Sequence, residues 1–173
     1  MNYRLIIILS LVVWISGCGG SDDNFKYEVP INSIAFTIPA GLNPTEFHQF
    51  SVLVPISEFV EAAVNEDTYT EIIPNVAVIR SSFGSQLLDF ANDISITFCP
   101  EDSNIPSCGT ETFWRNPVQI NERTPLELYA NQNNVVDIVE EGQFVQINIR
   151  FSQLRATTFQ SLDCFLDMRL RIR

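Results

Sequence analysis

Positive charge is scarce in this sequence. The chain has 10 lysine and arginine residues against 21 aspartate and glutamate residues, a formal net charge of −11 at pH 7, and Lys26 is the only lysine. An acidic chain repels phosphate backbones and anionic lipid head groups. The composition therefore predicts that nucleic acid is not a partner.

Catalytic motifs are also lacking. The one histidine, His48, stands just before an expected strand without a partner motif, and the chain has no Gly-x-Ser-x-Gly, no His-Glu-x-x-His and no glycine-rich phosphate loop. The acidic residues around Asp89 and Glu101 fit no calcium-binding loop, and scattered carboxylates do not identify a glycosidase pair. We therefore predict a protein that is not an enzyme, with no catalytic residue, no metal site and no cofactor.

No hydrophobic run in the sequence is long enough for a permanent membrane helix, which needs roughly 20 apolar residues. The longest run, Leu5 to Ile15, ends at the small residues Ser16 and Gly17, and the basic residue Arg4 precedes it. This order of a basic residue, an apolar run and small residues is typical of a secretory signal. We interpret the first 17 residues as a signal peptide.

The residues at the end of this run carry a family resemblance. Ile15-Ser16-Gly17-Cys18 resembles the lipobox of bacterial lipoproteins, and the following Gly19-Gly20-Ser21-Asp22-Asp23-Asn24 is similar to the short acidic tag of surface-exposed lipoproteins of Bacteroidota. The resemblance implies cleavage before Cys18 and lipidation of Cys18. It also implies a lipid-anchored protein of the outer membrane that faces the cell exterior. The alternative is an ordinary signal peptide with a chance cysteine.

The remaining chain has the composition of one globular domain, with 46% hydrophobic and 18% charged residues. Residues 19 to 30 are mostly polar and are expected to form a tether. The expected division is therefore a signal peptide at 1–17, the lipidated cysteine and tether at 18–30, and a folded domain at 31–173.

Alternating apolar and polar residues predict that the domain is all-β. The pattern is clearest at 34–38, 50–56, 94–98, 144–151 and 162–173, and shorter apolar segments occur at 70–79, 87–90, 113–120 and 126–130. Pro55 indicates an edge strand or a strand end. Only residues 57–65 have helical periodicity, with Ser57 as the expected N-cap. We predict a single antiparallel β-sandwich of immunoglobulin-like architecture with one short helix; a closed barrel is the alternative.

Three cysteines remain once Cys18 is assigned to lipid. Cys99 and Cys108 flank a polar loop with two prolines, and Cys99 alternates onto the polar face of its strand. A local Cys99–Cys108 disulfide is the natural pairing in an oxidising compartment. Cys164 alternates with leucines and is expected to be a buried free thiol.

Two further patterns suggest surface chemistry. Phe113 and Trp114 follow the expected disulfide loop and would form a weak candidate platform for a sugar ring; the alternative is that one of these rings caps the core. Five arginines lie near the end of the chain, and we expect them to meet acidic side chains on a neighbouring strand rather than to form a basic patch. They are Arg150, Arg155, Arg169, Arg171 and Arg173.

These observations predict a membrane-anchored, surface-exposed lipoprotein that acts as a non-catalytic binding or accessory module of the cell envelope. The alternatives are a glycan-binding module that uses Trp114 and a scaffold subunit of an envelope complex. The expected partners are the membrane, through the lipid anchor, and either a glycan or an envelope protein.

Overall fold

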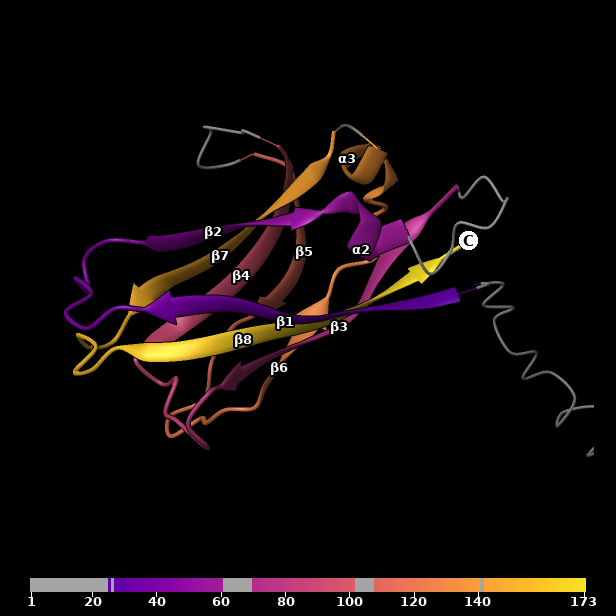
Figure 1. Ribbon diagram of the computed structural model, residues 1–173. Helices are drawn as coiled ribbons and strands as arrows, with labels where there is room; N and C mark the ends of the chain where they lie inside the picture. Colours follow the sequence, from indigo (N-terminus) through magenta and orange to yellow (C-terminus); the bar gives the residue numbers. More distant parts are fainter. Residues whose placement is uncertain (1–24, 26, 61–69, 102–107, 141) are drawn as a thin grey trace, which may run out of the picture.

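The computed structural model describes residues 25, 27–60, 70–101, 108–140 and 142–173 (Figure 1). This part of the chain is all-β, with eight strands and two short helices. The elements are β1 (Tyr27–Ile38), β2 (His48–Pro55), α2 (Ile56–Val60), β3 (Ile72–Ser81), β4 (Ala91–Pro100), β5 (Thr110–Arg115), β6 (Leu126–Ala130), α3 (Val136–Glu140), β7 (Phe144–Leu154) and β8 (Leu162–Ile172). Neither described helix is long and apolar enough to cross a membrane.

The strands form one antiparallel sheet in the order β1-β8-β3-β6-β5-β4-β7-β2. The short strand β6 connects its two halves, because β6 pairs with β3 through Ala77 and Leu128 and with β5 through Trp114 and Tyr129. The sheet curls until its edge strands β1 and β2 approach, with the rings of Phe36 and Phe50 6.4 Å apart. The expected all-β antiparallel class is confirmed. The described strands form one continuous, nearly barrel-shaped sheet that is not clearly the expected two-sheet sandwich.

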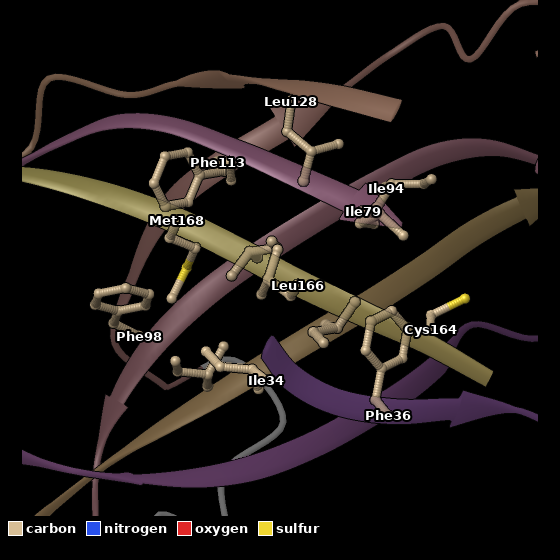
Figure 2. Close-up of a cluster of buried hydrophobic side chains, with 14 of the residues drawn as sticks. Ile34, Phe36, Ile79, Ile94, Phe98, Phe113, Leu128, Cys164, Leu166 and Met168 are labelled. Atoms are coloured by element: carbon tan, nitrogen blue, oxygen red, sulfur yellow. The ribbon is translucent and has the colours of Figure 1, made fainter. Parts of the chain in front are cut away.

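The alternating pattern places one face of every long strand inside the barrel. In β7, Ile147, Ile149 and Phe151 are fully buried, and they belong to the same core cluster as Leu166 and Met168 of β8 (Figure 2). Cys164 points inward within this cluster as a buried free thiol, as expected. Burial and, to a lesser extent, the charge of Asp163 raise the pKa of Cys164 to about 11. The thiol therefore stays protonated and acts as a small apolar side chain.

Both helices lie at one end of the barrel. In α2, Phe59 is fully buried with its ring edge-on to Phe98 at 5.7 Å, so this helix covers the core at that end. The expected N-cap is wrong: α2 begins at Ile56, so Ser57 lies inside the helix. Residues 61–65 of the expected helix lie outside the described residues.

The second helix, α3, corrects the expectation of a single helix. The Oδ1 atom of Asn134 accepts a hydrogen bond from the amide of Val136 at 3.1 Å, and the carbonyl of Val135 accepts the first helical bonds. The Oδ1 atom of Asn134 also accepts the amide of Ile72 at 2.9 Å. Asn134 therefore fixes the chain just before α3 and ties it to the beginning of β3.

The start of β1 and the extent of the strands differ from what the sequence predicts. Strand β1 begins at Tyr27 and takes in the last four residues of the expected tether, because Val29 is buried and pairs with Leu170 of β8. The apolar segments at 87–90 and 118–120 form no strand of the sheet. They belong to loops that meet through one isolated bridge between Leu87 and Arg123 and a hydrogen bond from the amide of Leu88 to the carbonyl of Glu122.

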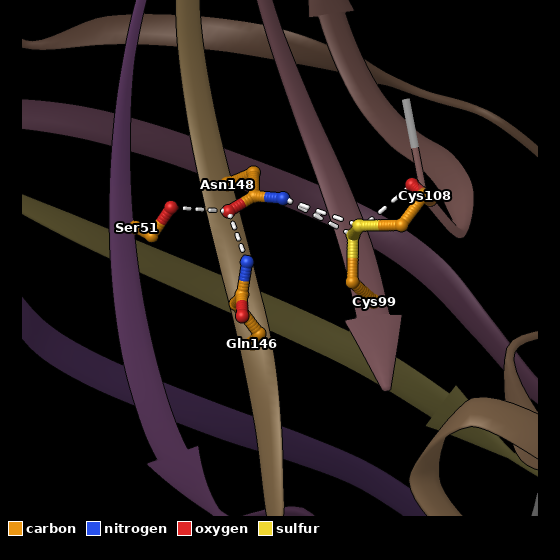
Figure 3. Close-up of a disulfide and its surroundings, with 5 residues drawn as sticks. All are labelled: Ser51, Cys99, Cys108, Gln146 and Asn148. Atoms are coloured by element: carbon orange, nitrogen blue, oxygen red, sulfur yellow. Dashed lines mark hydrogen bonds between the residues drawn. A yellow bond between two sulfur atoms is a disulfide. The ribbon is translucent and has the colours of Figure 1, made fainter. Parts of the chain in front are cut away.

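The expected disulfide is present. Cys99 and Cys108 are bonded across the start of β5 with their Cα atoms 5.6 Å apart (Figure 3). The side-chain amide of the buried Asn148 donates toward Sγ of Cys99 at 3.1 Å, and its Oδ1 atom accepts from Ser51 and Gln146. The disulfide thus lies on the outer face of the sheet and contacts Asn148, a buried polar side chain whose nitrogen and oxygen both have hydrogen-bond partners.

Candidate functional site

A cavity of about 480 Å³ opens at the end of the barrel away from the two helices. Its walls come from the loops that follow β3, β5 and β7, and its volume lies in the range of small-molecule sites. Three apolar side chains at its rim are exposed: Leu87 at 38%, Ile120 at 74% and Phe159 at 96%. Large exposed apolar groups that gather at one place are typical of interaction sites.

Arg155 holds the walls of this cavity together. Its guanidinium donates to the carbonyls of Asp89 and Ala91 at 3.1 Å each and to the carbonyl of Val118 at 2.7 Å, and it also bonds the Oδ1 atom of Asn92. The planar guanidinium has five N–H donors in a fixed fork, so one side chain can bind several carbonyls at once. Three loops are thereby fixed to one another without a ligand.

Two buried threonines brace the same loops. The hydroxyl of Thr124 accepts the amide of Gln86 at 2.9 Å. The hydroxyl of Thr158 donates to the carbonyl of Pro39 at 2.7 Å and accepts the amide of Leu42 at 3.1 Å. Because these bonds satisfy backbone groups that would otherwise need water, the cavity is largely preformed.

The charges of the cavity differ from those of the chain as a whole. Its lining carries two arginines, Arg123 and Arg155, and one aspartate, Asp89, which leaves one positive charge on a chain of net charge −11. The carboxylate of Asp89 accepts the amide of Asn121 at 2.9 Å. Among the described residues no carboxylate pairs with Arg123, whose guanidinium makes only a long 3.4 Å contact to the carbonyl of Ser85.

The sequence reasoning did not identify this cavity. Its lining residues are scattered over three loops, and no local spacing connects them. The available signal was the presence of Leu87, Ile120 and Phe159 in segments rich in turn-forming and polar residues, where apolar side chains have no strand face to occupy.

The structure separates the two candidate ligand-binding aromatics. Phe113 is fully buried and points into the barrel, so it is corrected from a surface platform residue to a core residue. Trp114 is the next residue of β5 and therefore lies on the outer face, because successive side chains of a strand alternate. The expected paired platform does not form, and the prediction that one ring caps the core describes Phe113.

Trp114 instead pairs with an aromatic residue from the neighbouring strand. Its ring lies 5.1 Å from that of Tyr129, which is half exposed, and the guanidinium of Arg115 lies 4.9 Å from the centre of the Tyr129 ring. Arg115 also reaches Glu122 at 3.6 Å. This cluster is a second, smaller candidate surface.

The arginines near the end of the chain only partly follow expectation. Arg173 pairs with Glu71 at 3.3 Å, but Arg150 lies over the ring of Phe47 at 4.2 Å and Arg155 binds backbone carbonyls. The acidic residue Asp167 pairs with Arg80 of β3. The expected acidic partner is thus found for Arg173, whereas Arg150 packs on an aromatic ring and Arg155 binds the loops.

The remaining polar candidates have structural partners. Asp93 accepts the hydroxyl of Ser152 at 2.7 Å, and a ring nitrogen of His48 lies 2.9 Å from the carbonyl of Asn43. Within the described ranges, no group of three or more histidine, cysteine, aspartate or glutamate residues could hold a metal ion. Cys18 and the acidic tag lie outside the described residues.

No protein-family model matches the chain, and no curated protein matches it.

Proposed function

We propose that this protein is a lipoprotein, anchored in the outer membrane through Cys18 and facing the cell exterior, that acts as a non-catalytic binding module. The observation that supports it best is the preformed apolar cavity at the end of the barrel. Sites for small ligands are mostly apolar, with a few polar groups that fix orientation. The cavity has this composition, since Arg123, Arg155 and Asp89 are the charged groups of its lining.

The position of the cavity suits a protein held at its N-terminal side. Strand β1 starts at Tyr27, directly after the tether, and its 12 residues span about 40 Å. The far end of β1 is bound to the cavity rim, because the carbonyl of Pro39 accepts the hydroxyl of Thr158. The loops that line the cavity therefore lie at the opposite end of β1 from its first residue, Tyr27 (Figure 1). A lipid at Cys18 would leave the cavity facing away from the membrane.

The anchor is tested by labelling cells with radioactive palmitate. We expect the wild-type protein to be labelled and Cys18→Ala to remain unlabelled. An unlabelled wild type beside a labelled control lipoprotein would refute the anchor.

Exterior display is tested separately with Asp22→Ala/Asp23→Ala, which we expect to lower the protease accessibility of the protein on intact cells. Unchanged accessibility would reject the acidic tag.

The binding site is tested with the neutral fluorescent probe N-phenyl-1-naphthylamine. We expect Ile120→Ser/Phe159→Ser to weaken probe binding about fivefold or more, because both side chains contribute apolar area at the rim. Phe83→Ser is the matched control, since Phe83 is 75% exposed on a nearby loop but does not line the cavity. Equal binding by all three proteins would place the binding function elsewhere.

A second candidate function is glycan binding at the pair formed by Trp114 and Tyr129. The observation that favours it is their contact on the outer face, where two tilted rings with centroids 5.1 Å apart offer an apolar aromatic surface. We expect Trp114→Ala to abolish retention on any immobilised glycan that retains the wild type, whereas Tyr27→Ala at the start of β1 should not. A wild type that no glycan retains would exclude this function. If the same envelope proteins then co-purify with this protein after mild crosslinking, the result would favour a scaffold function.

A further inference from the structure

We propose that the cavity binds an amphiphile with an apolar body and a single anionic group, and that the anionic group pairs with Arg123. This inference rests on the proposed function, because it assumes that the cavity is the binding site. It adds the chemical class of the ligand, which follows from the lining of the cavity and from the state of its three charged residues.

The apolar body follows from the walls. Phe90 and Leu162 form the buried part of the lining, and Leu87, Ile120 and Phe159 continue it to the surface. A polar or multiply charged molecule would lose water against these side chains without gaining hydrogen bonds. A volume of about 480 Å³ accommodates a small aromatic or acyl group rather than a folded partner.

The anionic group follows from the charges. Asp89 is held by the amide of Asn121, and Arg155 is engaged with three backbone carbonyls and Asn92. Arg123 is left without a carboxylate partner among the described residues. A guanidinium beside an apolar surface favours a carboxylate or another oxyanion, such as a phosphate or a sulfonate, which it can bind through two hydrogen bonds.

The position of Arg123 is fixed although its charge is unpaired. Its backbone bridges to Leu87, so the side chain starts from a wall of the cavity. The neighbouring acidic residue, Glu122, is directed to Arg115 at 3.6 Å and does not neutralise Arg123. One arginine without a carboxylate partner in the described part of the chain argues for one anionic group, and a net positive lining argues against a cationic ligand.

The test uses two nearly identical fluorescent probes, 1-anilinonaphthalene-8-sulfonate and N-phenyl-1-naphthylamine, of which only the first carries a charge. We expect Arg123→Gln to weaken binding of the sulfonate by roughly threefold to tenfold and to leave binding of the neutral probe within about twofold. Arg169→Gln is the matched control, because Arg169 is an exposed arginine of β8 that does not line the cavity. Circular dichroism verifies that each variant folds.

The outcomes separate this inference from the proposed function. If Ile120→Ser/Phe159→Ser weakens both probes while Arg123→Gln weakens neither, the cavity binds apolar molecules without charge selection and the inference is wrong. If the sulfonate binds with the same affinity to Arg123→Gln and Arg169→Gln, the inference is also wrong. If neither probe depends on Ile120 and Phe159, the proposed function of the cavity fails.

Discussion

Individual residues have backbone constraints that the alternation of apolar and polar residues does not reveal. Gly109 has a φ of +71° next to Cys108, and a Cβ atom at this position would lie 1.7 Å from the carbonyl oxygen of Phe98. Gly84 has a similar φ of +65°, but a Cβ atom there would meet nothing within 4 Å. A side chain at Gly84 would therefore cause backbone strain alone, whereas a side chain at Gly109 would cause both backbone strain and a steric clash.

We expect Gly109→Ala to be the more destabilising of the two alanine substitutions. Gly84→Ala should lower the free energy of unfolding by about 1 kcal/mol through backbone strain alone. Gly109→Ala must also displace the end of β4 and should cost at least about 2 kcal/mol more. Urea unfolding of both variants measures the difference. Equal costs would show that the hairpin of β4 and β5 can shift without penalty.

Asp167 is a second residue with a specific task. Its carboxylate binds Arg80 of β3 and accepts the amide of Ser33 at 2.8 Å, where a bulge interrupts the pairing of β1 with β8. The hydrogen bond from Arg80 is the main cause that lowers the pKa of Asp167, and the amide of Ser33 acts in the same direction. The charged carboxylate thus joins three strands on the outer face.

The lowered pKa of Asp167 predicts the sign of a pH effect. A depressed folded-state pKa gives stability that is present above the unfolded-state pKa, which for aspartate is about 3.9, and that is lost as pH falls through the folded-state value. We expect Asp167→Asn to melt below the wild type at pH 6, and the gap to close on acidification below about pH 4. Glu127→Gln on neighbouring β6 is the control. A gap that is independent of pH would contradict the assignment.

At the scale of elements, the loops that line the cavity are held together by hydrogen bonds from Arg155 to residues that are distant in the sequence. Arg155 lies 66 residues from Asp89 and 37 residues from Val118, and it binds the carbonyls of both. Nearby backbone bonds run from the amide of Val118 to Asn92 and from the amide of Arg155 to Phe90. The side-chain hydrogen bonds of Arg155 and these backbone bonds form one cooperative unit.

We expect Arg155→Lys to loosen this unit without unfolding the barrel. A lysine keeps the charge but cannot bind several carbonyls with a planar fork. Amide hydrogen exchange at residues 91 and 118 should become about tenfold faster, which corresponds to about 1.4 kcal/mol, while exchange in β7 and β8 should not change. Arg169→Lys provides the control. Unchanged exchange at residue 118 would show that the other loop bonds suffice.

The elements of the barrel differ in how clearly the sequence predicts them. Strands β7 and β8 were predictable, because every second side chain is buried and the pattern lies in consecutive residues. Helix α3 was not, since Val136 to Glu140 is too short for a helical period to show. The continuous sheet depends on β6, which pairs on both sides with only five residues. The disulfide was predictable from local spacing, whereas the cavity depends on bonds between distant loops.

At the scale of the whole molecule, the start of β1 and the loops that line the cavity lie at opposite ends of the barrel. The start of β1 and the end of β8 pair through Tyr27 and Ile172, and the exposed residue Thr70 is bonded to Arg173 at the same end. The loop after β3 carries the exposed Phe83 near the cavity. If Cys18 is lipidated as proposed, the nine residues from 18 to 26 could extend at most about 30 Å, which is shorter than the barrel wall formed by β1.

This geometry predicts how a lipidated protein stands on a bilayer. We expect a fluorophore at Thr70→Cys to be quenched strongly by spin-labelled lipids in vesicles that carry the anchored protein, and a fluorophore at Phe83→Cys to be quenched much less. The buried Cys164 leaves the introduced cysteine as the accessible thiol of the described residues. The Cys18→Ala protein, mixed with the same vesicles, supplies the background. Equal quenching at both sites would mean that the exposed apolar side chains at the cavity rim rest on the membrane, so that the cavity would face lipid instead of the cell exterior.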